Sequence, residues 1–196
     1  IFRNPYIAGS KWGFEFQLRN LPTKENSTEY IDYCVKDHFN LSLALSYEYQ
    51  IEKILLVGTS YRKEKLEYYG FNSTASEIII VPPPREAQVL FLQYKSQNLD
   101  KHTFYVDGWS NNAYFSISLP YSSGEEVKIS LIDEVKLYKR FGRKINLGFR
   151  AMAGLSSSDW HYYQPFIADS YYNIRGIGYR SYRGNTAAFL NFEYRH

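Results

Sequence analysis

A two-residue alternation of side-chain polarity runs through long stretches of this chain and constrains its fold more than any other feature. From Phe39 to Ile51 every odd position is apolar, and every even position is small or polar. Successive side chains of a β-strand point to opposite faces, so this pattern predicts a strand with one apolar and one polar face. The same pattern predicts further strands at 12–19, 55–61, 88–97, 113–121, 127–141, 145–153 and 187–195, and 104–109 is either a separate strand or the start of the next one.

The lengths of these segments separate the possible β-folds. The sequence predicts about eight strands, and several have nine or more residues. Strands in globular sheets usually have ~5–6 residues, whereas a tilted membrane-spanning strand needs ~9–11. A membrane helix needs ~18 or more apolar residues, and the apolar runs of this chain, such as Ile78 to Val81, are far shorter. A helical membrane protein is therefore excluded, and a soluble all-β protein and a membrane barrel remain.

The composition favours the barrel. Aromatic residues make up 18% of the chain, with 20 Tyr and 13 Phe. Tyr and Trp have an apolar body and a polar tip, which suits positions at a membrane–water interface. The net charge is only +3 and there is no basic block, so nucleic acid is not an expected partner. We therefore predict an all-β protein, an antiparallel transmembrane β-barrel of about eight strands over residues 1–196.

The connectors are of two kinds. Short turns are predicted at Phe141–Lys144 and Gln97–Lys101, and long polar connectors at Asn20–Asp37, Gly70–Glu86 and Ser156–Asn185. Short turns on one side and long loops on the other are typical of outer-membrane barrels. The last connector is rich in aromatic residues and Arg, unlike disordered segments, so we expect it to fold back into the barrel lumen before the last strand.

This last region resembles a known family. The run from Asp169 to Tyr179, then Arg183-Gly184, then Phe189 to Arg195, is similar to the Omp85 superfamily of outer-membrane assembly and secretion barrels. The resemblance is strong over Lys144–Arg195. It implies that Arg175, in a lumen-directed loop, pairs with carboxylates of the inner barrel wall, and that Glu193 is such a partner. The loop motif comprises Ile174, Arg175, Gly176, Ile177, Gly178 and Tyr179, and departs from the family at Ile177, where an aromatic residue is usual.

The resemblance also implies a function. Barrels of this family insert or translocate proteins at the bacterial outer membrane, and the sequence leaves open whether this chain is an insertase or a secretion pore. The expected partners are outer-membrane lipid, client β-barrel or secreted proteins, and other copies or chains that complete the barrel. The barrels of this family have more strands than the eight or so that are predicted for this chain. The chain is therefore an excised piece, a shortened relative or one part of an oligomeric barrel. No POTRA domain is seen in the sequence.

Two other readings stay open, and several motifs are set aside. The chain could be a small passive barrel, porin-like or adhesin-like, or a soluble aromatic-rich β-protein that binds carbohydrate or protein. Ser157, Ser158, Asp159 and His161 lie close in sequence but lack a nucleophile elbow, and the histidines lack metal-ligand spacing. We therefore expect no enzymatic activity, no metal and no cofactor.

Overall fold

The computed structural model is a β-structure in all of its described parts. It describes residues 2–4, 10–20, 23–26, 31–71, 84–102, 105–122, 126–142, 145–157, 166–168 and 182–195. No helix that is long and apolar enough to cross a membrane occurs among these residues. The strands are β1 (Phe2–Asn4), β2 (Trp12–Asn20), β3 (Thr23–Asn26), β4 (Ile31–Gln50), β5 (Lys53–Phe71), β6 (Arg85–Lys101), β7 (Val106–Pro120), β8 (Lys128–Phe141), β9 (Ile145–Ser156), β10 (Phe166–Ala168), β11 (Tyr182–Gly184) and β12 (Thr186–Arg195).

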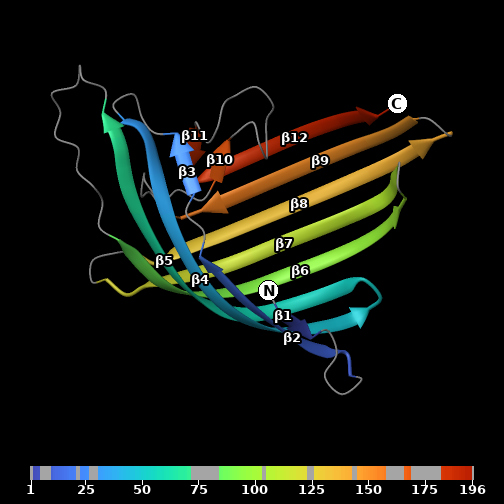
Figure 1. Cartoon of the computed structure of the whole chain (residues 1–196). Helices are drawn as coiled ribbons and strands as arrows, with labels where there is room; N and C mark the ends of the chain where they lie inside the picture. The colour runs from blue at the N-terminus through green and yellow to red at the C-terminus, as the bar shows by residue number, and fades with distance from the viewer. Residues whose placement is uncertain are drawn as a thin grey trace.

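Eight long strands form one antiparallel sheet in the order β2-β4-β5-β6-β7-β8-β9-β12 (Figure 1). The short strand β1 continues the sheet beyond β2, and β3 pairs with β4. This confirms the predicted all-β antiparallel fold and its number of long strands. The sheet is open, because among the described residues β12 pairs only with β9 and β1 only with β2.

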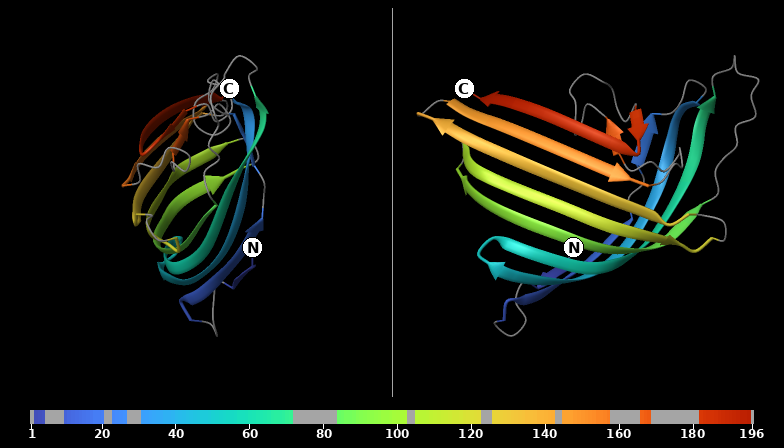
Figure 2. Two further views of the ribbon diagram at one scale, coloured as in Figure 1. Left: turned by 90° about the vertical axis from the view of Figure 1, so that its left-hand side faces the viewer. Right: turned by 180° about the vertical axis from the view of Figure 1, so that it is seen from behind.

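The sheet curves into a trough. Figure 2 shows the strands wrapping around one side of the molecule, with β2 and β12 on separate edges. The register aligns residues of the same parity across the strands, which gives the trough a convex and a concave face. One row of Cα partners on the convex face crosses all eight long strands: Phe14, Leu45, Val57, Leu92, Phe115, Leu131, Leu155 and Thr186.

The hairpin of β4 and β5 extends much further than the alternation indicates. Residues Asn20–Asp37 were predicted as a connector, and this is wrong for Thr23–Asn26 and for Ile31–Asp37, which are strand. Their pairing with β5 continues as far as the partners Ile31 and Phe71.

The turns lie close to their predicted places, with one correction. Gln97–Lys101 was predicted as a turn, but it is the end of β6, paired with β7 up to Lys101 and Val106. The chain reverses directly afterwards, where the His102 amide donates to the Tyr105 carbonyl over 2.9 Å. The turn predicted at Phe141–Lys144 is confirmed, since Phe141 pairs with Ile145 and Gly142 has a positive φ of 65°. Residues 104–109 are not a separate strand, because β7 starts at Val106.

Candidate functional site

The convex face is apolar and exposed. Leu43, in the middle of β4, is 55% exposed, and similar values recur on every long strand. Contiguous exposed apolar surface of this extent marks a region that meets lipid or another protein. Its exposed large side chains on the long strands are Trp12, Phe16, Leu18, Leu41, Leu43, Leu45, Tyr49, Leu55, Val57, Leu90, Leu92, Trp109, Phe115, Leu119, Ile129, Leu131, Leu137, Phe141, Phe149, Leu155, Leu190, Phe192 and Tyr194.

Aromatic side chains lie at both ends of this apolar band. Towards the short turns, Trp12 packs on Tyr47 with ring centroids 4.7 Å apart, and the Tyr49 hydroxyl donates to the Tyr94 hydroxyl over 3.2 Å. Towards the longer connectors, the Tyr61 ring lies 6.0 Å from that of Tyr121. Aromatic belts at both edges of an apolar band are a mark of membrane barrels. Trp12 and Trp109 both lie on the exposed convex face.

The convex face becomes charged one row of residues beyond Tyr61 and Tyr121, towards the longer connectors. The Lys63 ammonium lies 2.5 Å from Glu86 Oε1, and the Tyr61 hydroxyl donates to Glu86 Oε2 over 2.8 Å. These two donors, the ammonium first, hold the pKa of the Glu86 carboxyl below its ordinary value. The row therefore marks where the apolar band ends and a solvated surface begins.

The convex face has one polar interruption inside the band. The Asn111 amide donates to the Asp133 carboxylate over 2.7 Å. The register partners of Asp133 on the two neighbouring strands are the small residues Ala113 and Ala153. A carboxylate surrounded by apolar side chains costs free energy, which this hydrogen bond partly offsets.

The concave face carries small polar side chains together with buried apolar ones, among them Leu56, Val89 and Phe189. Several of its residues are buried although they are polar, because the trough and the segments folded onto it cover them; they are Ser46, Ser60, Arg85, Ser116, Ser130 and Asn146. Glu134 accepts from Arg150 Nε over 2.5 Å and lies 2.7 Å from the Lys136 ammonium. A polar cleft of about 110 Å³ lies between Glu15, Arg62 and Tyr114. A wall of this kind suits a wet interior, as barrel lumens have.

The long connector before β12 is anchored on the concave face. Its two short strands β10 and β11 pair with each other, and both lie beside the start of β12 (Figures 1 and 2). Phe166 of β10 is buried, with its ring directly over Gly154 of β9, where a Cβ would overlap it. The Ser156 amide donates to the Asn185 carbonyl over 2.8 Å and closes the base of the connector. Gly154 is therefore needed because Phe166 occupies the space of a side chain.

The predicted loop motif falls outside the described residues. This holds for all six of its members, Ile174, Arg175, Gly176, Ile177, Gly178 and Tyr179. Glu193 is described: it lies on the concave face, and Arg195 donates to it from Nε over 2.9 Å and from a terminal nitrogen over 3.0 Å. The pairing of Arg175 with Glu193 thus stays a prediction, and Glu193 already has one guanidinium partner.

The structure describes only Ser157 of the four residues that were set aside as a catalytic group, which are Ser157, Ser158, Asp159 and His161. Its hydroxyl accepts from the Ile129 amide over 2.9 Å, and its own amide donates to the Ile129 carbonyl. This hydroxyl therefore continues the pairing of β8 and β9 beyond the end of β9. Within the described ranges, no three His, Cys, Asp or Glu side chains are grouped as metal ligands would be.

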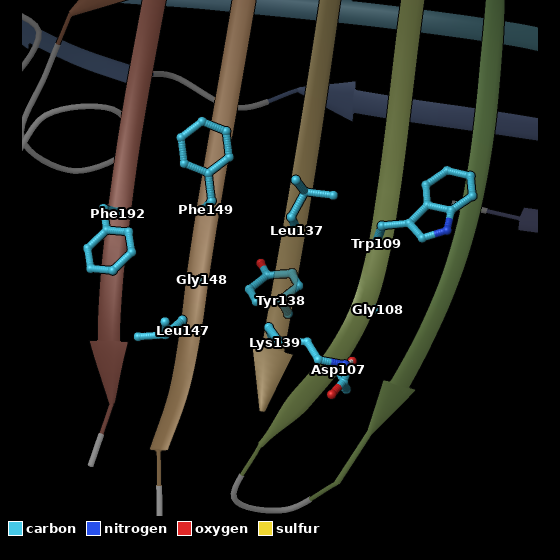
Figure 3. A pocket seen from close by; sticks show the side chains of 10 residues that line it. All are labelled: Asp107, Gly108, Trp109, Leu137, Tyr138, Lys139, Leu147, Gly148, Phe149 and Phe192. Carbon is cyan, nitrogen blue, oxygen red and sulfur yellow. Dashed lines mark ion pairs between the residues drawn. The ribbon is translucent and has the colours of Figure 1, made fainter. Parts of the chain in front are cut away.

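Sequence reasoning missed a groove on the convex face near the short turns. The groove has a volume of about 380 Å³, and Trp109, Leu137, Phe149 and Phe192 form a row across four strands along it (Figure 3). Lys139 and Asp107 lie nearer the strand ends, and the backbone of Gly108 forms part of the lining. We call this site the Trp109 groove. The only sequence signal for it is Gly108, whose φ of 113° is strained for other residues.

Comparisons with protein-family models, with curated proteins and with solved structures give no match to this chain.

Proposed function

We propose that this chain is a membrane-spanning part of an outer-membrane β-barrel of the Omp85 type, which takes part in inserting or translocating other proteins. The observation that carries the proposal is the exposed apolar band on the convex face, with aromatic side chains at both of its edges, opposite a concave face that buries several polar side chains. From Leu41 to Tyr49 the band covers nine residues of β4, and a tilted membrane-spanning strand needs ~9–11. In water the same face would be a strong aggregation surface.

The anchored connector supports the family assignment. In that family a long loop folds into the lumen ahead of a strand with an Asn-x-Glu-Tyr-Arg ending. Here Phe166 packs on the concave face of β9. In β12, the alternate positions that face the concave side are those of Asn191, Glu193 and Arg195. The connector thus starts and ends on the side where a lumen would be. Arg175 would brace that lumen by pairing with wall carboxylates and would carry out no chemistry.

The open edge of β12 supports a role in handling client strands. Leu190 and Phe192 are 74% and 69% exposed, and among the described strands only β9 pairs with β12. An unpaired strand edge can template an incoming strand. In hydrocarbon every backbone group needs a partner, so a client strand gains free energy by pairing there. The same edge would accept other copies or chains that complete the barrel.

Site-specific photo-crosslinking tests the proposal. A photoreactive phenylalanine analogue replaces Phe192 on the edge strand β12, or Phe115 on the interior strand β7 as a matched convex-face control. The chain is reconstituted in liposomes and offered an unfolded outer-membrane barrel. We expect client crosslinks from position 192 and few from position 115, with faster folding of the client than in empty liposomes.

The other outcomes separate the alternatives. A chain that enters liposomes but neither crosslinks to nor accelerates the client is a passive barrel. A chain that stays in solution without detergent is a soluble β-protein, and the membrane proposal is then wrong.

A further inference from the structure

The Trp109 groove combines an apolar wall with two opposite charges at one end. Trp109, Leu137 and Phe149 are register partners on neighbouring strands, so their side chains form a continuous ridge. Leu147 lies between this ridge and the strand ends (Figure 3). The volume of about 380 Å³ falls within the ~300–1,000 Å³ of typical small-molecule sites. The wall suits an apolar chain that lies along the strands.

The charges at the end of the groove are Lys139 and Asp107. The Lys139 ammonium lies 3.6 Å from Asp107 Oδ1, which is longer than a hydrogen bond. The Lys139 side chain is 66% exposed and that of Asp107 30%. Asp107 Oδ2 accepts from the Arg140 amide over 3.2 Å, which fixes the carboxylate on its strand. The two charges are therefore neighbours that keep capacity for a further partner.

Nearby charged groups are engaged elsewhere. Arg140 stacks on the Tyr105 ring, with its guanidinium carbon 3.7 Å from the ring centroid. Asp100 lies 2.9 Å from the His102 ring nitrogen. Among these groups, only Lys139 and Asp107 line the groove. The groove therefore offers one cation and one anion, side by side, at the end of an apolar channel.

We propose that the Trp109 groove binds one phospholipid molecule with a zwitterionic, primary-ammonium headgroup. The lipid phosphate contacts Lys139, the lipid ammonium donates to Asp107, and an acyl chain lies against Trp109 and Phe149. This inference rests on the proposed function, because it places the convex face in a bilayer with the short turns at its surface. Lipid headgroups then stand at the level of the two charges.

The charge pattern selects among lipid classes. An anionic headgroup would meet Lys139 but would be repelled by Asp107. A choline headgroup has the same net charge as the proposed ligand, but its quaternary ammonium has no N–H to donate to the carboxylate. A primary ammonium has three donors and can form a charge-assisted hydrogen bond. The difference between these lipids therefore tests the contact with Asp107.

Quenching of Trp109 fluorescence provides the test. The chain has three Trp, and Trp12→Phe with Trp160→Phe leaves Trp109 as the reporter. The protein is reconstituted in choline-lipid vesicles containing a small fraction of brominated lipid, with an ethanolamine, choline or glycerol headgroup. We expect quenching by the ethanolamine lipid to indicate about three- to fivefold enrichment over the choline lipid, the size of one half-exposed charge-assisted contact. Equal quenching by the three lipids would overturn the proposal.

Variants locate the selectivity. Asp107→Asn should bring the ethanolamine lipid to the level of choline, and Asp107→Glu should keep the preference. The matched control is Lys53→Gln, at the turn between β4 and β5, where Lys53 donates to Gln50 over 2.7 Å. Loss of the preference in the control, or its persistence in Asp107→Asn, contradicts the assignment. Flotation with the vesicles separates the two failures: a chain that does not float refutes both proposals, and one that floats without preference refutes only the groove.

Discussion

The two faces of the sheet differ in the side chains that they expose: large apolar ones are exposed on the convex face, and small polar ones are buried on the concave face beside Leu56 and Val89. On the concave face Ser46 and Ser60 are 4% exposed, whereas on the convex face of the same strands Leu43 and Val57 are 55% and 56% exposed. Burying hydroxyls while exposing leucines is unfavourable in water. In a bilayer with a wet lumen the same arrangement is favourable, because lipid covers the large side chains. The comparison is therefore the main support for the proposal that the convex face lies in a membrane.

A charge on the convex face should break this relation most strongly. Leu43→Lys places an ammonium in the middle of the apolar band and should lower the free energy of unfolding in vesicles by about 2–4 kcal/mol. On a water-exposed surface the same change would be within ~0.5 kcal/mol. The matched control is Ser42→Asn, one residue away on the concave face, which should change stability little. The measurement is denaturant unfolding of the vesicle-bound protein. Equally small losses of stability in Leu43→Lys and Ser42→Asn would contradict the proposal that the convex face meets lipid.

The contact between Gly154 and Phe166 tests how the concave face holds the connector. Gly154→Ala puts a Cβ into the space of the Phe166 ring and should destabilise by about 1–3 kcal/mol. Gly148→Ala on the same strand is the control, because its Cβ would meet the Tyr138 ring at 3.3 Å, a contact that small movements relieve. In a double-mutant cycle, Phe166→Ala should remove most of the Gly154→Ala penalty. Additive effects would show that the ring is not seated there.

The Asn111–Asp133 pair is the exception on the convex face and sharpens the comparison. Asp133→Ala removes a carboxylate from the lipid-facing band and should stabilise the vesicle-bound protein by about 1 kcal/mol. Asn111→Ala removes its donor and should destabilise by about 1–3 kcal/mol. Unfolding in vesicles measures both. If Asp133→Ala destabilises instead, the carboxylate serves a partner on this face and the band is not uniformly lipid-facing.

The charged row beyond the aromatic belt should produce the smallest effect. Because the folded pKa of Glu86 is depressed, its contribution to stability is present above the unfolded value of 4.5 and is lost as pH falls through the lower folded value. Glu86→Gln should therefore lower the free energy of unfolding slightly at neutral pH, where this contribution is present, and flatten the pH dependence of stability in the acidic window. A pH series of unfolding curves tests this, and an unchanged acidic slope would contradict the ion pair with Lys63.

The two-residue alternation predicted the strands correctly where one face of a strand is apolar and the other is largely polar. Phe39–Ile51 and 145–153 were recognised because their two environments differ. Gln97–Lys101 was missed because side chains on both of its faces are exposed, so its pairing leaves no polarity pattern in the sequence. The strand residues Ile31–Asp37 were missed as well. Strand ends outside a membrane are thus set by hairpin register, which a single sequence does not encode as periodicity.

The candidate sites show a similar limit. Glu193 was placed on the polar face by parity, and the register agrees. The Trp109 groove was not foreseen, because it is assembled from β7, β8, β9 and β12 and depends on how their registers align. Gly108 and Gly154 were the available signals, and neither reveals which ring or carbonyl occupies the space beside it.

Spin-label accessibility along β4 tests the central claim most directly. Single cysteines are placed in turn at positions 41 to 46 of a Cys34→Ser chain in vesicles, and collision rates with oxygen and with a water-soluble nickel complex are measured. We predict a two-residue period, with labels at Leu41, Leu43 and Leu45 accessible to oxygen and those at Ser42, Ala44 and Ser46 shielded from it. Labels at all six positions that are equally accessible to the nickel complex would contradict a lipid-facing convex surface.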